Sequence, residues 1–325
     1  MKTTIQASSD VALVKYWGKK DEILRLPENG SISMILEGLD TKTTVEFQSE
    51  LELDDVLIAG EKGKGEEERV SKHLDRIRKL AGVPTFAKVV SENVFPKGTG
   101  LSSSGSGFAA LTLAATKALG MNLSQKELSI LARQGSGTAC RCVCGGFVEW
   151  KDGDTSETSY AETIFSKEYF DIRDVVAVVS EGKKAISSTQ GHANAKSGIF
   201  FQARQAHIQQ KIEAVKQAVG KKDFTLLGEL VEAEALEFHS ILFTSSPSHI
   251  AWYPGTIEVI LAVQQMRRDG IKAYFTINTG FNVHVLTLPE YETEVCDRLQ
   301  KLSLVQKCIR TTVGDAPKEL HTHLF

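Results

Sequence analysis

The feature that most constrains this chain is a glycine- and serine-rich stretch, Phe95-Pro96-Lys97-Gly98-Thr99-Gly100-Leu101-Ser102-Ser103-Ser104-Gly105-Ser106-Gly107-Phe108. Small apolar residues follow at once, over 109–119, and predict a buried helix that ends at Gly120. A loop of this kind at the start of a helix presents backbone N–H groups, hydroxyl donors and the partial positive charge of the helix N-terminus. Because apolar elements flank the loop on both sides, a phosphate site explains it better than a serine-capped surface turn does.

The composition limits the classes of protein to which the chain can belong. Its 325 residues are enough for two domains that share one cleft. A net charge of −3 gives no basis for bulk attraction to nucleic acid or to a membrane surface. No apolar run approaches the roughly 18 residues of a membrane span, and residues 1–6 do not resemble a signal peptide. The five cysteines, three of them at Cys-x-Cys spacing, indicate reduced thiols in a cytoplasmic protein.

The order of expected elements predicts an α+β protein with two domains, 1–182 and 183–325. The strongly apolar strand 174–179 is a natural place for the first domain to end. Residues 187–192 are expected to form a polar turn before a long helix. Strands and helices alternate in both halves without a strict βαβ rhythm, which favours α+β over a parallel α/β sheet. Further strands are expected at 31–36, 88–93, 146–150, 272–277, 283–288 and 309–313, and further helices at 66–80, 124–131, 208–219, 224–238 and 256–268.

Two other stretches carry residue types suited to binding anions. Lys15 stands among Val14, Tyr16 and Trp17, which is an unusual setting for a lysine that is only solvated. Residues 133–141 place two hydroxyls, two arginines and several small residues together. Hydroxyls beside a guanidinium form a good receptor for a second phosphate group, because arginine donates two parallel hydrogen bonds.

At this point a resemblance becomes specific. The loop at 96–106 resembles the phosphate loop of the GHMP kinase superfamily, which includes galactokinase, homoserine kinase and mevalonate kinase. Within that superfamily, Val11-Ala12-Leu13-Val14-Lys15-Tyr16-Trp17-Gly18-Lys19 resembles the signature of the diphosphomevalonate decarboxylases. The stretches 133–141, 145–150 and 274–282 are similar to the same family, and the likeness runs nearly end to end.

The resemblance implies a fold, a reaction and a set of ligands. The fold would be a ribosomal S5-like N-terminal domain and a ferredoxin-like C-terminal domain with the active site between them. The reaction would be the ATP- and Mg²⁺-dependent decarboxylation of mevalonate 5-diphosphate, in which the 3-hydroxyl is phosphorylated and phosphate and CO₂ then leave to give isopentenyl diphosphate. Homodimers are common among such relatives, although nothing in the sequence locates an interface.

The resemblance also implies a role for particular residues. Lys15 would bind or polarise the substrate near the reacting hydroxyl, and Ser106 would add a hydroxyl on the Mg²⁺ side. The phosphate end of the substrate would be held by Tyr16, Lys19, Ser136, Thr138 and Arg141, with Ser188 on the side of the second domain. The ATP phosphates would be held by Lys97, Gly98, Gly100, Leu101, Ser102, Ser103, Ser104 and Ser106.

The chain departs from the family pattern at several positions. The aspartate that the family uses as base for the 3-hydroxyl is replaced by Asn278, and an amide cannot accept that proton. Phe281 stands where the family usually has proline, and Asp10 where it usually has asparagine. Residues 189–192 lack an arginine that some relatives carry.

Three explanations of Asn278 remain open. In the first explanation, Asn278 is an engineered substitution that stops turnover. The otherwise intact motifs favour this explanation. In the second explanation, Asn278 is natural, and the protein is a 3-kinase that phosphorylates mainly by positioning its substrates and does not decarboxylate. Or Asp10 and Asn278 have exchanged roles across the cleft.

The substrate and the class of activity also leave alternatives. A rival substrate is mevalonate 5-phosphate, which would give isopentenyl phosphate, and an enzyme that accepts both substrates is a further alternative. A non-catalytic nucleotide-binding protein is the alternative from a different class.

Overall fold

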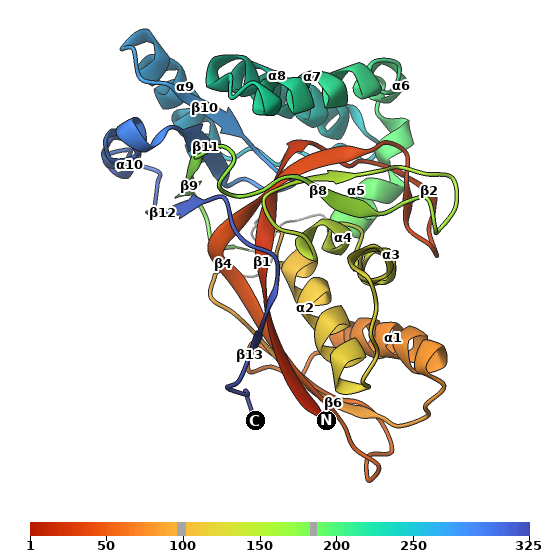
Figure 1. The fold of residues 1–325 in the computed structure, drawn as a ribbon. Coiled ribbons are helices and arrows are strands. Elements are labelled where there is room, and N and C mark those ends of the chain that lie inside the picture. The colour runs from red at the N-terminus through yellow and green to blue at the C-terminus, as the bar shows by residue number, and fades with distance from the viewer. Residues whose placement is uncertain (96–101, 183–186) are drawn as a thin grey trace.

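The computed structural model describes residues 1–95, 102–182 and 187–325, and it is an α+β structure with two β-sheets (Figure 1). The first half of the glycine- and serine-rich loop therefore lies outside the described residues. Four residues expected to bind the ATP phosphates fall there: Lys97, Gly98, Gly100 and Leu101.

The first sheet is built around two long antiparallel strands, β1 and β4, with the strand order β13-β1-β4-β6-β5. Strand β7 adds to β4, and β8 pairs with β7. The pairing of β1 with β4 shifts register between Ser8 and Asp10 and again between Ala12 and Val14. Such irregularities bend a strand and redirect its side chains, here just before Lys15. The strands are β1 (Lys2–Val14), β4 (Ser31–Phe47), β5 (Asp55–Ile58), β6 (Ala87–Asn93), β7 (Phe147–Trp150), β8 (Ala161–Phe165) and β13 (Lys318–Leu320).

Four helices pack beside this sheet and enclose its core: α1 (Lys64–Ala81), α2 (Ser103–Ala118), α3 (Gln125–Gly135) and α4 (Ala139–Cys142). Helix α2 is the alanine-rich helix expected after the serine loop, and most of its residues are buried. Its buried threonines bond back to carbonyls of their own helix, Thr112 to Phe108 at 2.6 Å and Thr116 to Thr112 at 2.8 Å. Polar groups on a buried helix face are thereby satisfied.

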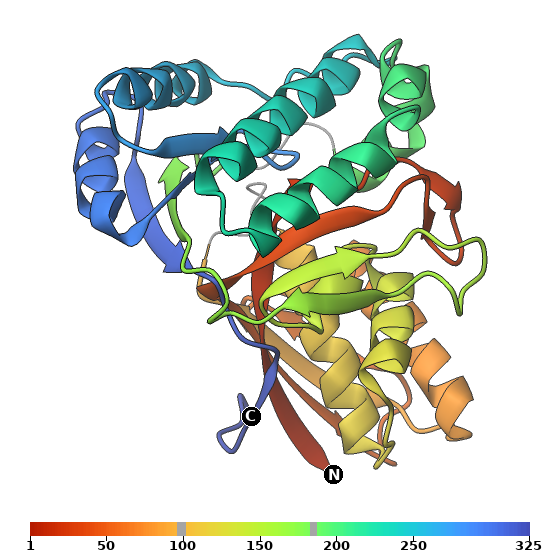
Figure 2. The same ribbon diagram turned by 45° about the horizontal axis from the view of Figure 1, so that its top comes forward.

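The second sheet is antiparallel with the order β10-β11-β9-β12. Apolar side chains of α9 and α10 form a core against one face, and those of α7 and α8 form a core with the other face and with β1 and β4. Figure 2 shows α7 and α8 side by side, with α7 next to β4. The elements are β9 (Arg173–Val178), β10 (Ala273–Thr276), β11 (Val283–Thr287), β12 (Lys307–Thr312), α7 (Ile208–Gly220), α8 (Phe224–Thr244), α9 (Pro254–Arg268) and α10 (Glu292–Gln300).

The structure differs from the sequence-based expectation at three places. The strand expected to end the first domain, 174–179, is β9 of the second sheet, where it lies between β11 and β12. The expected turn at 187–192 is the short helix α5 (Ser188–Ala193), whose Ser187 and Gln190 form a reciprocal capping box. The last strand, β13, returns to the first sheet and pairs Leu320 with Thr4.

Short elements complete the described chain: β2 (Lys19–Asp21), β3 (Leu26–Pro27), α6 (Phe201–Gln205) and the 3₁₀ turns η1 (Ala195–Ser197) and η2 (Pro289–Tyr291). Strands β2 and β3 form a hairpin directly after the Lys15 segment. All five cysteines are free thiols, as expected. In the described part of the chain, no helix combines the length and the apolar character needed to cross a membrane.

Candidate active site

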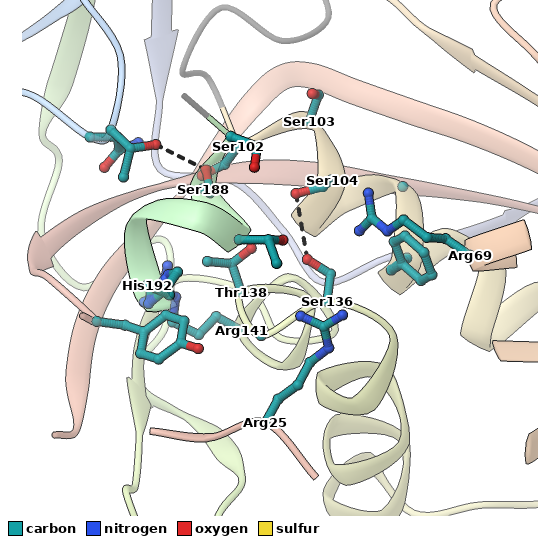
Figure 3. Close-up of a pocket in the computed structure, with 18 of the residues that line it drawn as sticks. Arg25, Arg69, Ser102, Ser103, Ser104, Ser136, Thr138, Arg141, Ser188 and His192 are labelled. Carbon is teal, nitrogen blue, oxygen red and sulfur yellow. Dashed lines mark hydrogen bonds between the residues drawn. The ribbon is translucent and has the colours of Figure 1, made fainter. Parts of the chain in front are cut away.

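A cavity of about 580 Å³ lies where the two halves of the chain meet. Figure 3 shows side chains from distant parts of the sequence converging on it. The β1 end supplies Lys15 and Tyr16, the start of α2 supplies Ser102–Ser104, and α5 supplies Ser188 and His192. The predicted site residues that line it are Lys15, Tyr16, Lys19, Ser102, Ser103, Ser104, Ser136, Thr138, Arg141, Ser188 and Asn278.

Lys15 lines this cavity with a buried amine, and 3% of the residue's surface is exposed. Its Nζ donates hydrogen bonds to the Ala12 carbonyl at 2.6 Å and to the Thr276 hydroxyl at 2.7 Å, and contacts Asn278 Oδ1 at 3.3 Å. Burial away from water disfavours the charged amine and lowers the pKa of Lys15 to about 7, against an attraction to Glu234 that raises it. The nearest polar atoms of the β10–β11 turn are neutral, so they restore little of the lost hydration.

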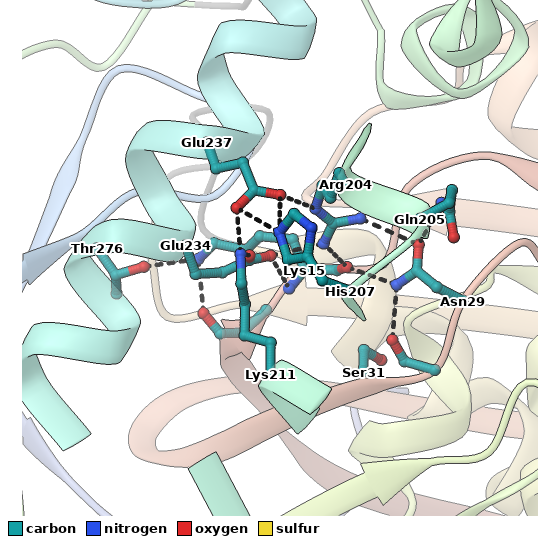
Figure 4. Close-up of polar contacts among 12 residues, drawn as sticks. Lys15, Asn29, Ser31, Arg204, Gln205, His207, Lys211, Glu234, Glu237 and Thr276 are labelled. Carbon is teal, nitrogen blue, oxygen red and sulfur yellow. Dashed lines mark hydrogen bonds and ion pairs between the residues drawn. The ribbon is translucent and has the colours of Figure 1, made fainter. Parts of the chain in front are cut away.

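A buried ion network holds the backbone of Lys15 from behind (Figure 4). Glu234 Oε1 accepts the Lys15 amide N–H at 2.9 Å and pairs with Arg204 at 2.6 Å. Arg204 in turn donates to the Lys15 carbonyl at 2.7 Å. Lys211 bonds the other oxygen of Glu234 at 2.7 Å. Because Glu234 and Arg204 are fully buried and come from the second half of the chain, they fix the end of β1 against α6 and α8.

The sequence motifs did not single out Arg204 or Glu234. A charged residue on the apolar face of a helix is the sequence signal that could have marked Glu234. It lies on the same face of α8 as Val231 and Ala235, and that face is otherwise apolar.

Asn278 stands at the mouth of the β10–β11 turn, where a carboxylate was expected from the family pattern. Its Oδ1 accepts from the Ala12 amide at 3.3 Å and contacts Lys15, and its Nδ2 has no partner within the described residues. Glu66 is the one carboxylate among the described residues that line the cavity. Asn278 therefore has the position of a proton acceptor but not the chemistry of one.

Asp10 and Arg141 form a fully enclosed pair. Arg141 directs Nε and a terminal nitrogen at Asp10 Oδ2, both at 2.7 Å, and its other terminal nitrogen donates to Ser31 Oγ at 2.8 Å. Arg141 borders the cavity, whereas Asp10 does not. The structure thus gives Asp10 no access to a ligand, and an exchange of roles with Asn278 places no carboxylate in the cavity.

The hydroxyls expected to bind phosphates divide into two sets. Ser102, Ser103 and Ser104 face the cavity at the N-terminus of α2, and Ser104 lies 3.4 Å from Ser136. Ser106 is instead fully buried, with its hydroxyl 2.7 Å from that of Thr41, and does not line the cavity. Ser106, which was expected to supply a hydroxyl on the Mg²⁺ side, therefore points toward the sheet and not into the cavity.

On the second-domain side, Ser188 Oγ lies 3.2 Å from the hydroxyl of Thr279, the neighbour of Asn278. His192 stacks on the ring of Tyr16 with centroids 4.2 Å apart, and its Nδ1 accepts the Gly18 amide at 3.1 Å. The Tyr16 hydroxyl is buried without a partner among the described residues, and burial raises the pKa of this phenol.

The cavity fits a magnesium nucleotide better than a resident metal. Among the described residues, no cluster of three or more histidine, cysteine or carboxylate side chains could hold a metal ion. Mg²⁺ commonly keeps waters and binds through substrate phosphates, so it does not need such a cluster. The α2 N-terminus offers the hydroxyls of Ser102–Ser104 to those phosphates, and Ser102, at the N-cap, has a left-handed φ of 55°.

Two arginines on the cavity wall were not chosen as site residues from the sequence. Arg25 comes from the β2–β3 hairpin, and Arg69 comes from α1 and lies over the Phe108 ring with its Cζ 5.0 Å from the centroid. Arg25 interrupts the apolar run Leu24-Arg25-Leu26-Pro27, which is the signal that could have marked it.

Comparison with known proteins agrees with this arrangement. Residues 7–161 match the model of the diphosphomevalonate decarboxylase-like N-terminal domain. Residues 174–322 match the model of the mevalonate 5-diphosphate decarboxylase C-terminal domain. The two-domain fold and this cleft define a GHMP kinase-like ATP-binding protein. The chain belongs to the diphosphomevalonate decarboxylase family, as its motifs predicted.

Individual relatives match over nearly their full length. The phosphomevalonate decarboxylase of Haloferax volcanii is 35% identical, with 91% of each chain covered. The crystal structure of mevalonate diphosphate decarboxylase from Staphylococcus aureus superimposes with a TM-score of 0.93 at 35% identity, over 98% of each chain. A structure of a protein called MDDEF in complex with MVAPP, AMPPCP and magnesium gives a TM-score of 0.93 at 34% identity, over 99% of each chain.

Proposed function

We propose that this chain catalyses the ATP- and Mg²⁺-dependent decarboxylation of mevalonate 5-diphosphate to isopentenyl diphosphate, ADP, phosphate and CO₂. The observation that carries the proposal is that one cavity joins the buried amine of Lys15, the serines of the α2 N-terminus and the hydroxyls at 136–138. The family models cover both halves of the chain that supply these groups.

Each group has a task suited to its surroundings. Lys15 binds the substrate at the reacting end, where its amine is held by Ala12 and Thr276. Tyr16, Lys19, Ser136 and Thr138 bind the phosphate end, together with Ser188 from α5. Arg141 borders the cavity with its charge compensated by Asp10, since its nitrogens already bond Asp10 and Ser31.

The nucleotide phosphates are placed at the start of α2, where Ser102–Ser104 and the helix N-terminus favour negative charge. The adenine ring of the nucleotide has room among the residues of α1 and β6 that line the same cavity, including Val70 and Val89. Bound Mg²⁺ neutralises phosphate charge, which is most of what phosphoryl transfer requires.

Asn278 sets the rate of this reaction. Phosphoryl transfer depends mainly on positioning and charge neutralisation, so a cavity without a general base still accelerates it. A positioned general base typically adds 10²–10⁴-fold. Slow turnover is therefore expected from the chain as it stands.

The direct test follows ADP and CO₂ in the same reaction with ATP, Mg²⁺ and mevalonate 5-diphosphate, for this chain and for Asn278→Asp. Equal amounts of ADP and CO₂ from either protein support the proposal. Release of ADP without CO₂ from both would identify a 3-kinase, and ATP binding without either product would identify a non-catalytic binding protein.

Mevalonate 5-phosphate is the second candidate substrate. It is favoured by the Haloferax volcanii relative, which is named a phosphomevalonate decarboxylase, and by the absence of arginine from residues 189–192. A side-by-side measurement of kcat/KM on the two substrates decides between them.

Two further expectations belong to this proposal and await measurement. A cytoplasmic location suits an enzyme with five free thiols. A homodimer is expected by analogy with relatives, and light scattering on the purified chain would give its mass in solution.

A further inference from the structure

Arg25 has no ion-pair partner among the described residues, unlike Lys19 and Arg141 in the same cavity. Lys19 pairs with Glu22 at 2.5 Å, and Arg141 pairs with Asp10 at 2.7 Å. Within the described residues, Arg25 makes no ion pair, and its one hydrogen bond runs from Nε to the Gln134 carbonyl at 3.1 Å. An arginine held by Nε alone keeps both terminal nitrogens for a ligand.

The guanidinium of Arg25 is aimed into the cavity. Figure 3 shows it directed toward Ser136, which follows Gln134 and the end of α3. The anchor to Gln134 therefore ties Arg25 to the same segment that supplies the hydroxyls at 136 and 138. Its backbone φ of 52° lies in the left-handed region, a conformation that non-glycine residues adopt at a cost and that is frequent at functional sites.

The charges around Arg25 favour the binding of an anion. Its positive charge acts on Tyr16, whose buried hydroxyl has no partner among the described residues. It also opposes the charge of Arg69 across the cavity, and this repulsion adds to burial in lowering the pKa of Arg69. Both guanidiniums line the cavity, and an anion that enters between them would relieve their repulsion.

The position of Arg25 along the cavity indicates which phosphate it would meet. Lys15 and Arg141 lie at the buried end, with 3% and 2% of their surfaces exposed, and Arg25 is only partly buried. A substrate bound with its reacting hydroxyl at Lys15 extends its phosphate tail away from that end. The outermost phosphate of the tail therefore comes nearest to Arg25.

We infer that Arg25 binds the terminal phosphate of a diphosphate substrate and so makes the cavity prefer mevalonate 5-diphosphate to the 5-phosphate. This rests on the proposed function for the identity of the substrate. Arg25 is a specificity-determining residue that the sequence motifs do not contain. It provides an arginine on the first-domain side, whereas residues 189–192 of the second-domain side contain none.

The test measures dissociation constants by calorimetry for Arg25→Gln and for a matched control, Arg76→Gln. Arg76 also feels the charge of Arg25, but its side chain is bonded to Lys72 on α1 and lies outside the cavity. For Arg25→Gln we expect weaker binding of mevalonate 5-diphosphate by roughly 10- to 100-fold, the effect of a charge-assisted hydrogen-bond pair. Affinities for mevalonate 5-phosphate and for an ATP analogue should change less than about threefold, and Arg76→Gln should change none of them.

Arg25→Lys separates charge from geometry, and is expected to recover only part of the lost affinity because it has no fork of donors. Equal loss for both mevalonate ligands, or loss for the ATP analogue alone, would overturn the assignment. Inorganic pyrophosphate is the independent probe. If the unaltered chain binds pyrophosphate in an Arg25-dependent way but no mevalonate ligand, the proposed substrate is wrong and the anion site stands. If pyrophosphate binding ignores Arg25, the anion site is wrong.

Discussion

At the scale of single residues, the proposed chemistry of this cleft centres on one amine, Lys15, and one amide, Asn278. Lys15 is buried and bonded to neutral groups, so its pKa is about 7 and its charge changes near neutral pH. Asn278 lies 3.3 Å from it and supplies neither a proton acceptor nor a negative charge. We therefore expect these two residues to determine the charge state and the rate of the site.

The first prediction concerns the pH dependence of substrate binding. The ammonium form of Lys15 is present below pH 7 and is lost as the pH rises through that value, so affinity for mevalonate 5-diphosphate should fall above pH 7. Titration of the ligand acts in the opposite direction, because its phosphate gains negative charge as the pH rises. The measurement is the dissociation constant between pH 6 and 8.5. Lys15→Arg should leave only the rise caused by the ligand, and an unaltered chain whose profile matches that of Lys15→Arg would contradict the account.

The second prediction concerns the ion network behind Lys15. Glu234→Gln removes a fully buried carboxylate from Arg204 and Lys211, and breaking a buried pair from one side costs about 3–5 kcal/mol. Urea unfolding would measure the loss. The matched control is Glu237→Gln in the same network, where the carboxylate is 26% exposed and the cost should be about 1 kcal/mol or less. Equal losses would contradict the role given to Glu234.

At the scale of elements, helix α5 brings the second half of the chain into the cavity. It is only six residues long, begins with a capping box and lies against Trp17. A Cβ added at Gly191 would stand 2.5 Å from the Trp17 ring, so this helix can lie so close only with glycine there.

Gly191→Ala should therefore displace α5 and the pocket residues Ser188 and His192. We expect KM for the mevalonate substrate to rise by about tenfold or more while the melting temperature changes little. Gly65→Ala in α1 is the control, because its added Cβ meets nothing within 4 Å and the higher helix propensity of alanine favours it. An unchanged KM in Gly191→Ala would show that α5 does not position the substrate.

The elements also show what could be predicted from sequence. The capping box at Ser124 and Glu127 and the helix after the serine loop follow from local signals and are confirmed. The Ser187–Gln190 box carries the same signal, although this polar segment was predicted to be a turn. The partners of β9 and β13 depend on pairing between distant strands, for which local sequence carries no signal.

The site divides in the same way. Lys15, Ser136 and Asn278 were recognised by motif and do share one cavity. Arg25, Arg204 and Glu234 belong to no motif, and their contacts come from distant parts of the chain. The sequence marks Arg25 and Glu234 only weakly, as charged residues in an apolar run or on an apolar helix face. A motif also does not tell which way a side chain points. Ser106 occupies its expected place in the serine loop, but its side chain faces Thr41 and the sheet.

At the scale of the whole molecule, the two halves share one apolar core. Residues of β1 and β4 pack there with residues of α7, α8, β9 and β11, and β13 returns the chain end to the first sheet. A core shared in this way should make the two halves unfold together.

Leu13→Ala tests this unity. Leu13 is fully buried in the shared core, so its truncation should cost about 2–5 kcal/mol, and the transitions followed by tryptophan fluorescence and by far-UV circular dichroism should shift together. Leu80→Ala, at a position 58% exposed, should stay within about 0.5 kcal/mol. Two separated transitions in Leu13→Ala would contradict a shared core.

The measurement that tests the account most directly is the rate of CO₂ release from mevalonate 5-diphosphate, with ATP and Mg²⁺, before and after Asn278→Asp. If the cavity is complete except for its proton acceptor, the aspartate should raise the rate by at least about 100-fold. Asn278→Ala should show no such gain. An unchanged or lower rate with aspartate would contradict the claim that residue 278 is the missing base of an otherwise intact decarboxylase site.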